Sequence, residues 1–239
     1  MTESLSSLER FLKNLEQVEN RIQQVCEKKH RDRKEITLIA VTKYLNSDQF
    51  QFLSASPIQD LGENRIQSLL ERIEASQSRI FRWHFIGHLQ TNKIAQMPPL
   101  QLIHSIDSEK LLHQLDIHYQ KKQKIQEVLL QINVTGESSK QGFSPETAFQ
   151  LLKQSLDLKA VRVLGLMTIA KLSESAEESR GPFRKLKQYL EDWKSLNHPW
   201  LNLKYLSMGM SQDFEIAIEE GATHLRLGSV LFQTVFVSE

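Results

Sequence analysis

Hydrophobic residues follow two alternating patterns along the chain. Short apolar runs rich in β-branched residues predict strands buried on both faces, whereas apolar residues spaced three and four positions apart predict helices. A helical pattern over residues 5–29, whose apolar face includes Cys26, precedes the first strand-like run. Strand-like runs then recur at residues 36–43, 58–62, 81–87, 102–107, 128–134, 161–168, 203–208 and 224–228.

Eight such strands alternating with helices within 239 residues predict a single domain over residues 1–239. We expect an α/β fold, a closed (β/α)₈ barrel of the TIM type with an extra N-terminal helix. An open doubly wound sheet is the alternative, but it usually carries a glycine-rich turn after its first strand. Here that turn reads Lys43-Tyr44-Leu45-Asn46-Ser47 and contains no glycine.

Several predicted helices have recognisable starts. Asn64 with Gln67 resembles a capping box, and Ser144-Pro145 reads as a cap followed by proline in the first turn. Ser211 stands shortly before acidic residues that suit the start of a helix.

Composition narrows the class of protein. The net charge is +1 and basic residues are not segregated from acidic ones, so we expect no nucleic-acid partner. A single cysteine excludes an internal disulfide and fits a reducing compartment. No apolar stretch is long enough to span a membrane, and the N-terminus does not resemble a secretory signal. We therefore expect a soluble cytoplasmic protein, and a monomer because no self-complementary apolar surface is evident.

Lys43 is the first candidate for chemistry. It ends the apolar run that begins at Ile36, so it should leave the sheet at the functional rim of a barrel. A lysine at the exit of a buried strand loses hydration, and an amine that can shed its proton near neutral pH can form a Schiff base with an aldehyde. The alternative is a lysine that merely leaves the sheet and extends into water.

Two loops that follow the seventh and eighth strands suggest a phosphate site. They read Ser207-Met208-Gly209-Met210-Ser211 and Arg226-Leu227-Gly228-Ser229. Each offers a glycine, a hydroxyl and the start of a helix, and the loops after strands seven and eight are the usual phosphate site of this barrel. Together with Lys43 they predict a site for pyridoxal 5′-phosphate (PLP), which carries an aldehyde and a phosphate on one ring.

Motifs occur in order along nearly the whole chain. They read Ala40-Val41-Thr42-Lys43, Gly62-Glu63-Asn64, Trp83-His84-Phe85-Ile86-Gly87-His88-Leu89-Gln90-Thr91-Asn92-Lys93, His104-Ser105-Ile106-Asp107, Leu164-Gly165-Leu166-Met167 and the two loops above. In this order they resemble the pyridoxal phosphate homeostasis protein family, single-domain barrels similar to the N-terminal domain of bacterial alanine racemase.

The resemblance implies a role for seven residues. Lys43 would carry PLP as a Schiff base, and Arg226 would face the pyridine nitrogen. Asn64 would lie beside the cofactor ring, although its capping role is equally consistent with the sequence. The phosphate would be held by Ser207 and by the backbone around Gly209, Gly228 and Ser229.

The chain departs from the family pattern at three positions. Ser229 stands where threonine is usual, and Thr42 stands where serine is usual, so each hydroxyl is kept. Gln233 stands where glycine is usual, which concerns the last turn rather than the phosphate loop.

The expected function is storage, buffering or delivery of PLP to apo-enzymes, without robust turnover. A cation beside the pyridine nitrogen disfavours the protonated ring, and an unprotonated ring stabilises carbanions less well. Racemases with this arrangement add a second base from another domain and subunit. The chain ends at Glu239, shortly after its eighth strand, so we expect no such domain here.

Three other functions are consistent with parts of the pattern. A PLP-dependent racemase-like enzyme would need a local base, for which Tyr44, Tyr205, His84 and His104 are candidates. A Schiff-base aldolase would prefer a lysine near strand six, where Lys171 lies beyond the expected rim. A non-catalytic scaffold would not need the paired phosphate loops.

Remaining polar features carry weaker expectations. His84 and His88 have helical spacing for a metal, but His84 belongs to a strand pattern and we expect no metal site. Lys140, after strand five, is a candidate second amine for PLP. The polar loop over residues 171–182 is a candidate lid.

Overall fold

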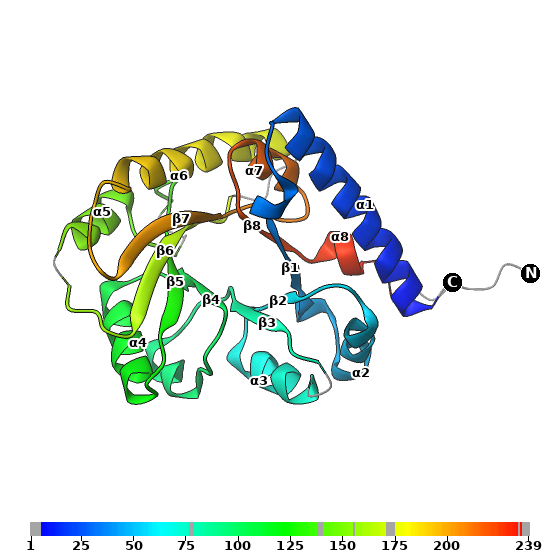
Figure 1. Ribbon diagram of the computed structural model, residues 1–239, viewed down its shortest axis with the longest axis horizontal. Helices are drawn as coiled ribbons and strands as arrows, with labels where there is room; N and C mark the ends of the chain where they lie inside the picture. The colour runs from blue at the N-terminus through cyan, green and yellow to red at the C-terminus, as the bar shows by residue number, and fades with distance from the viewer. Residues whose placement is uncertain are drawn as a thin grey trace, which may run out of the picture.

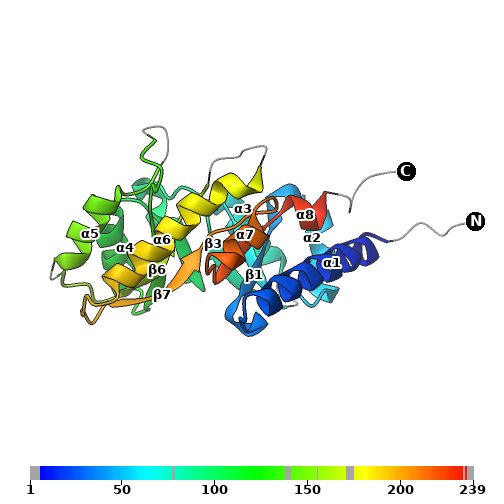
Figure 2. The same ribbon diagram turned by 90° about the horizontal axis from the view of Figure 1, so that it is seen from above.

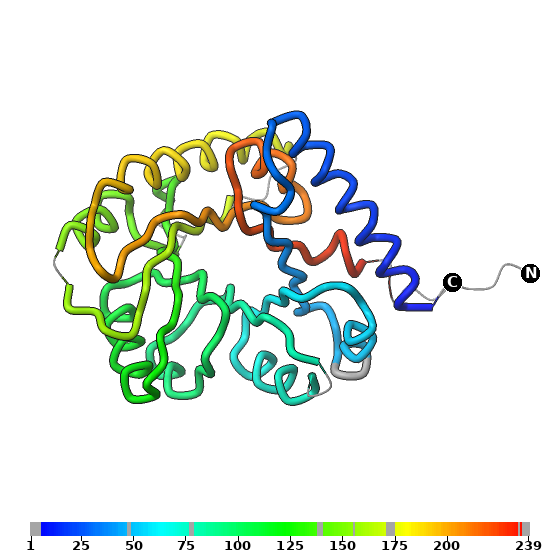
Figure 3. Tube along the Cα trace, in the orientation of Figure 1, coloured from blue at the N-terminus to red at the C-terminus, as the bar shows by residue number. Residues whose placement is uncertain are grey.

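The computed structural model describes residues 6–76, 79–137, 141–154, 156–170, 175–233 and 235. Its eight strands are parallel and form a closed barrel in chain order, in which β8 pairs with β1 (Figures 1 and 3). This confirms the predicted (β/α)₈ fold. The strands are β1 (Thr37–Val41), β2 (Asp60–Glu63), β3 (Arg82–Phe85), β4 (Leu102–Ile106), β5 (Gln126–Gln131), β6 (Val161–Met167), β7 (Leu201–Ser207) and β8 (His224–Leu227).

Helices and 3₁₀ turns surround the barrel. The α-helices are α1 (Ser7–Lys28), α2 (Ser47–Phe50), α3 (Ile66–Ala75), α4 (Glu109–Lys121), α5 (Pro145–Lys153), α6 (Arg180–Trp193), α7 (Phe214–Glu219) and α8 (Ser229–Phe232). The 3₁₀ turns are η1 (Arg33–Glu35), η2 (Thr42–Tyr44), η3 (Gln51–Ala55), η4 (Thr91–Gln96) and η5 (Ala176–Ser179). Among these described helices, none combines the length and apolar character needed to cross a membrane.

The extra N-terminal helix packs against the last elements of the barrel. A capping box between Ser6 and Glu9 starts α1, and its buried stripe matches the predicted apolar face. Phe11 stacks on Phe232 of α8 with ring centroids 5.3 Å apart, and Cys26 is fully buried. Figure 2 shows α1 running beside α7 and α8. This helix therefore braces the segment that follows β8.

Register at the β1–β8 seam brings the two ends of the sequence together. Ile39 pairs with Arg226, and Ala40 pairs with Leu227. The turn η2 that follows β1 therefore lies beside the loop that follows β8. This places Lys43 next to the Gly228-Ser229 loop at the carboxyl ends of the strands.

One of the predicted helix starts was wrong. Arg65, rather than Asn64, occupies the position before α3, and no side chain caps that helix. The acidic helix start predicted after Ser211 is confirmed, because Asp213 occupies the position before α7 and Glu215 lies in its first turn. Ser144 does cap α5, where it accepts a hydrogen bond from the Thr147 amide, and Pro145 is the first helical residue. Asn64 and Ser211 instead lie at the rim, where both line a cavity.

Candidate functional site

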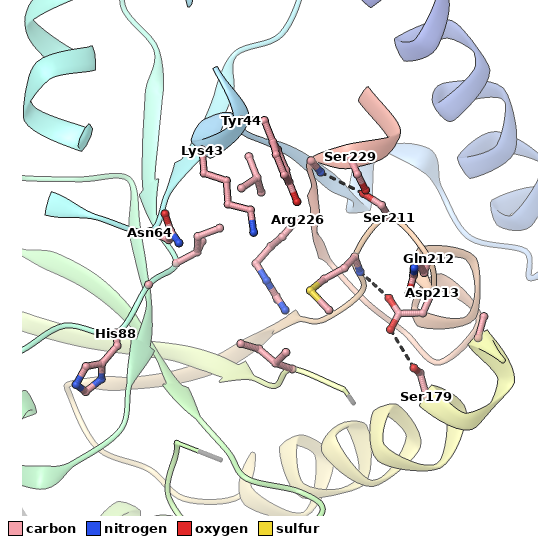
Figure 4. A pocket seen from close by; sticks show the side chains of 17 residues that line it. Lys43, Tyr44, Asn64, His88, Ser179, Ser211, Gln212, Asp213, Arg226 and Ser229 are labelled. Carbon is pink, nitrogen blue, oxygen red and sulfur yellow. Dashed lines mark hydrogen bonds between the residues drawn. The ribbon is translucent and has the colours of Figure 1, made fainter. Parts of the chain in front are cut away.

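A cavity of about 480 Å³ opens at the carboxyl ends of the strands (Figure 4). Loops after strands at opposite sides of the barrel contribute to it, as expected for the functional face of this fold. Its lining residues are Val41, Lys43, Tyr44, Asn64, Ile86, Gly87, His88, Ile169, Ala176, Ser179, Met210, Ser211, Gln212, Asp213, Arg226, Gly228 and Ser229.

Lys43 extends into this cavity from the turn η2, and Figure 4 shows its amine pointing toward the space above Arg226. Its Nζ lies 5.0 Å from the centre of the Tyr44 ring. The side chain is exposed, which differs from the desolvated lysine that the sequence suggested. The reason is that η2 carries Lys43 past the end of the strand and onto the wall of an open cavity.

A buried ion pair supports the turn that carries Lys43. The Thr42 hydroxyl donates a hydrogen bond to Oε1 of Glu63, and Arg72 Nε donates to the same oxygen at 2.5 Å. Arg72 Nη2 also donates to the carbonyl oxygens of Thr42 and Leu45. The side chains of Arg72 and Glu63 are 10% and 0% exposed. One charge pair therefore ties β2 and α3 to both ends of η2.

Arg226 places a second cation at the floor of the cavity. It is 5% exposed, and its guanidinium donates to Ser207 Oγ at 2.7 Å and to the Thr168 carbonyl at 3.0 Å. Burial lowers the pKa of Arg226 to about 10, so the guanidinium remains charged at neutral pH. Its hydrogen bonds fix the orientation of this charge beneath the amine of Lys43.

Backbone amides of the last loop converge beside these two cations. The amides of Gly228 and Val230 both donate to Ser211 Oγ, at 3.2 and 3.3 Å. Backbone amides of one loop that converge on one oxygen resemble the concavities that bind phosphate oxygens. The hydroxyls of Ser211 and Ser229 lie on the same wall (Figure 4). An amine, a buried cation and converging amides are the donor set that PLP requires, so the residues present fit this cofactor.

Five of the seven predicted site residues line the cavity, and two do not. Those that line it are Lys43, Asn64, Arg226, Gly228 and Ser229.

Ser207 and Gly209 lie below and behind the cavity wall. Ser207 is fully buried, and its hydroxyl is bonded to Arg226 and to His104. Gly209 has φ +94, and an added Cβ would lie 2.6 Å from Ala217 Cβ, so glycine is needed there for the path of the loop.

Sequence reasoning missed residues that shape the loop after β7. Asp213 accepts hydrogen bonds from the Met210 amide at 2.6 Å and from the Ser179 hydroxyl at 2.9 Å. It thereby ties this loop to the turn before α6. Nothing in the sequence signals the Ser179 contact, whereas Ser211 was visible in the loop motif and was interpreted as the start of a helix.

The candidate bases are spread over the barrel. Tyr44 lines the cavity, but His84 and His104 are buried inside the barrel and Tyr205 lies at the opposite mouth. His88 also lines the cavity, where its Nδ1 lies 3.0 Å from an oxygen of Asp107. Within the described ranges, no three His, Cys, Asp or Glu side chains converge as a metal site.

The second-amine, aldolase and lid candidates lie wholly or partly outside the residues that the structure describes. Lys140 and Lys171 both lie outside the described residues, so neither is placed relative to the cavity. Of the proposed lid over residues 171–182, the described part forms η5 and the first residues of α6.

Comparison with known proteins identifies related chains. Residues 10–234 match the family model of the alanine racemase N-terminal domain. A pyridoxal phosphate homeostasis protein of Aquifex aeolicus is 39% identical over 91% of this chain and 95% of its own length. The human pyridoxal phosphate homeostasis protein is 34% identical over 91% of this chain and 84% of its own length.

Solved structures agree with this relationship. A protein of unknown function from Bifidobacterium adolescentis has a TM-score of 0.87 and 26% identity, covering 97% of this chain and 98% of that one. PipY of Synechococcus elongatus, solved with PLP bound, has a TM-score of 0.76 and 29% identity, covering 89% of this chain and 99% of PipY.

Proposed function

The chain belongs to the pyridoxal phosphate homeostasis protein family, and on this premise we propose that it binds PLP for storage, buffering or delivery. The observation that carries the proposal is the convergence of Lys43, Arg226 and the Gly228-Ser229 loop in one cavity. The PLP bound to PipY supports the choice of cofactor.

The site residues then have the following roles. Lys43 Nζ is the amine that holds PLP covalently, as a Schiff base with the aldehyde carbon. Arg226 would face the pyridine nitrogen, and Asn64 would lie beside the ring, since both line the cavity. The amide and hydroxyl of Ser229, next to Gly228, would bind the phosphate. We assign the hydroxyl role first expected of Ser207 to Ser211, because Ser211 lies on the wall of the cavity and already accepts two loop amides.

The same geometry disfavours robust turnover. When bound, PLP can act as an electron sink for substrate carbanions, most effectively with a protonated ring nitrogen. Arg226 keeps a positive charge at that position, which opposes protonation of the ring. We therefore propose a carrier rather than an enzyme.

A racemase-like enzyme is the second candidate, favoured by the match to the alanine racemase N-terminal domain and by Tyr44 on the cavity wall. Alanine racemisation well above background, abolished in Lys43→Ala, would favour it.

We further propose that a single domain acts as a cytoplasmic monomer and passes PLP to apo-enzymes. We propose neither a nucleic acid nor a membrane as a binding partner. Sedimentation of the purified protein with and without PLP tests the monomer.

The visible absorption of purified protein tests PLP binding. Wild-type protein mixed with PLP and then freed of unbound PLP by gel filtration should remain yellow, and Lys43→Ala should not. Lys204→Ala is a matched control, because Lys204 is also exposed and its Nζ lies 4.7 Å from the ring centre of the next residue, Tyr205. A colourless wild type, or equal colour in Lys43→Ala, would contradict the proposal.

A further inference from the structure

A continuous chain of hydrogen bonds crosses the barrel interior below the cavity. Arg226 Nη1 lies 2.7 Å from Ser207 Oγ, which lies 2.7 Å from His104 Nδ1. His104 Nε2 lies 3.0 Å from His84 Nδ1, and His84 Nε2 lies 3.0 Å from Asp60 Oδ1. The five residues come from β8, β7, β4, β3 and β2, and each is at most 6% exposed.

The two ends, together with the neutral form that burial favours for both histidines, fix the direction of every hydrogen bond in this chain. A guanidinium can only donate, and an ionised carboxylate can only accept. His84 must therefore carry its proton on Nε2, toward Asp60, which leaves Nδ1 to accept from Nε2–H of His104. Nδ1 of His104 then accepts from the Ser207 hydroxyl, whose oxygen accepts from Arg226. In their neutral form, both histidines thus carry the proton on Nε2.

The electrostatics of the interior favour the same protonation states. Burial lowers the pKa of His84 and holds the pKa of His104 well below the usual value. Burial alone would raise the pKa of Asp60, but hydrogen bonds from Arg82 and His84 lower it to about 2. With an ionised Asp60 and neutral histidines at neutral pH, the hydrogen bonds of this row all point in one direction, from Arg226 toward Asp60.

The far end of the chain lies at the opposite mouth of the barrel. There Arg82 donates two hydrogen bonds to Asp60, at 2.8 and 2.5 Å. A polar cavity of about 200 Å³ surrounds this pair, and Glu127, Tyr205 and His224 also line it. The chain therefore spans the distance between the two faces of the barrel.

We propose that His84, His104 and Ser207 are positioning residues that hold the Arg226 guanidinium in place beneath the cofactor, with Asp60 as their anchor. The hydrogen-bond chain follows from the geometry alone. Its effect on the cofactor rests on the proposed PLP site.

Heteronuclear NMR of the histidine side-chain nitrogens in the PLP-free protein tests the chain by itself. His84 and His104 should both be neutral with the proton on Nε2 at neutral pH. In Asp60→Asn, which removes the charge that fixes the direction, the resonances of both histidines should shift. Imidazolium, or a proton on Nδ1 of either residue in the wild type, would overturn the proposal.

PLP titration of variants tests the positioning role. Ser207→Ala should bind PLP about tenfold more weakly, the order expected for one lost hydrogen bond to a charged group, and should shift the visible band. Ser207→Thr, which keeps the hydroxyl, should restore both. His118→Gln is a control, because His118 lies on α4 and takes no part in the row of hydrogen bonds inside the barrel. Its Nε2 contacts the Met97 carbonyl oxygen.

These outcomes distinguish the proposed positioning role from the proposed PLP-binding function. Folded Ser207→Ala and Asp60→Asn variants with wild-type affinity and spectrum would refute the positioning role. A wild type that fails to bind PLP, with the expected histidine tautomers intact, would refute the proposed function and leave the hydrogen-bond chain standing.

Discussion

The buried pair of Arg72 and Glu63 offers a sharp test of how the turn bearing Lys43 is held. Arg72→Met keeps the apolar length of the side chain but leaves the Glu63 carboxylate buried without its cation. Breaking a buried pair in this way costs about 3–5 kcal/mol. In a chain of this size each kcal/mol lowers Tm by about 2–4 °C, so we expect a fall of roughly 10 °C.

This test compares urea unfolding and PLP titration of the wild type, Arg72→Met and a double variant. The double variant Glu63→Gln/Arg72→Met removes the charge together with its partner, so it should regain most of the lost stability. It should still bind PLP more weakly than wild type, because the Thr42 and Leu45 carbonyls lack the Arg72 donor.

An exposed ion pair supplies the matched control. Lys194 and Glu191 lie 2.8 Å apart with side chains 43% and 49% exposed, so Lys194→Met should cost about 0–1 kcal/mol. The reasoning is wrong if Arg72→Met costs no more than Lys194→Met, or if the double variant is no more stable than the single one.

Further predictions concern backbone geometry and pH. Gly209→Ala should lose about 2–4 kcal/mol in urea unfolding, from its positive φ and the clash with Ala217, whereas Gly181→Ala, with open space around it, should not destabilise. Asp60, with its pKa lowered to about 2 from 3.8, stabilises the fold above about pH 4. The free energy of unfolding should fall by about 1–2 kcal/mol as the pH falls to about 2, and Asp60→Asn should not show this fall. Burial lowers the pKa of His224 from 6.5 to about 3, so the folded state keeps it neutral. The free energy of unfolding should therefore fall by up to about 1.4 kcal/mol per pH unit as the pH drops below about 6.5. Parallel curves of unfolding free energy against pH for wild type and His224→Gln would contradict this.

The barrel was predictable because its strands are apolar runs that alternate with helical patterns. Once eight strands are placed in a closed barrel, the proximity of Lys43 and Arg226 at its carboxyl end follows from topology. The choice between Ser207 and Ser211 did not follow, because both hydroxyls belong to one motif. Only the point where β7 ends decides which of them faces the cavity.

Contacts between segments that are distant in the sequence could not be predicted from it. His84 and His104 were visible as isolated candidate bases, but their bond depends on the register of β3 and β4 inside the barrel. The contact between Ser179 and Asp213 joins residues 34 positions apart and carries no local pattern. Asn64 satisfied a capping pattern, yet α3 begins two residues later and leaves it on the cavity wall.

Borohydride reduction of the PLP-loaded protein, followed by mass mapping, identifies the lysine that holds the cofactor. Reduction fixes PLP to the amine that holds it. We predict a single pyridoxyl adduct on Lys43 among the described residues, at a stoichiometry matching the visible band. Modification of another lysine instead, with Lys43 unmodified, would contradict it.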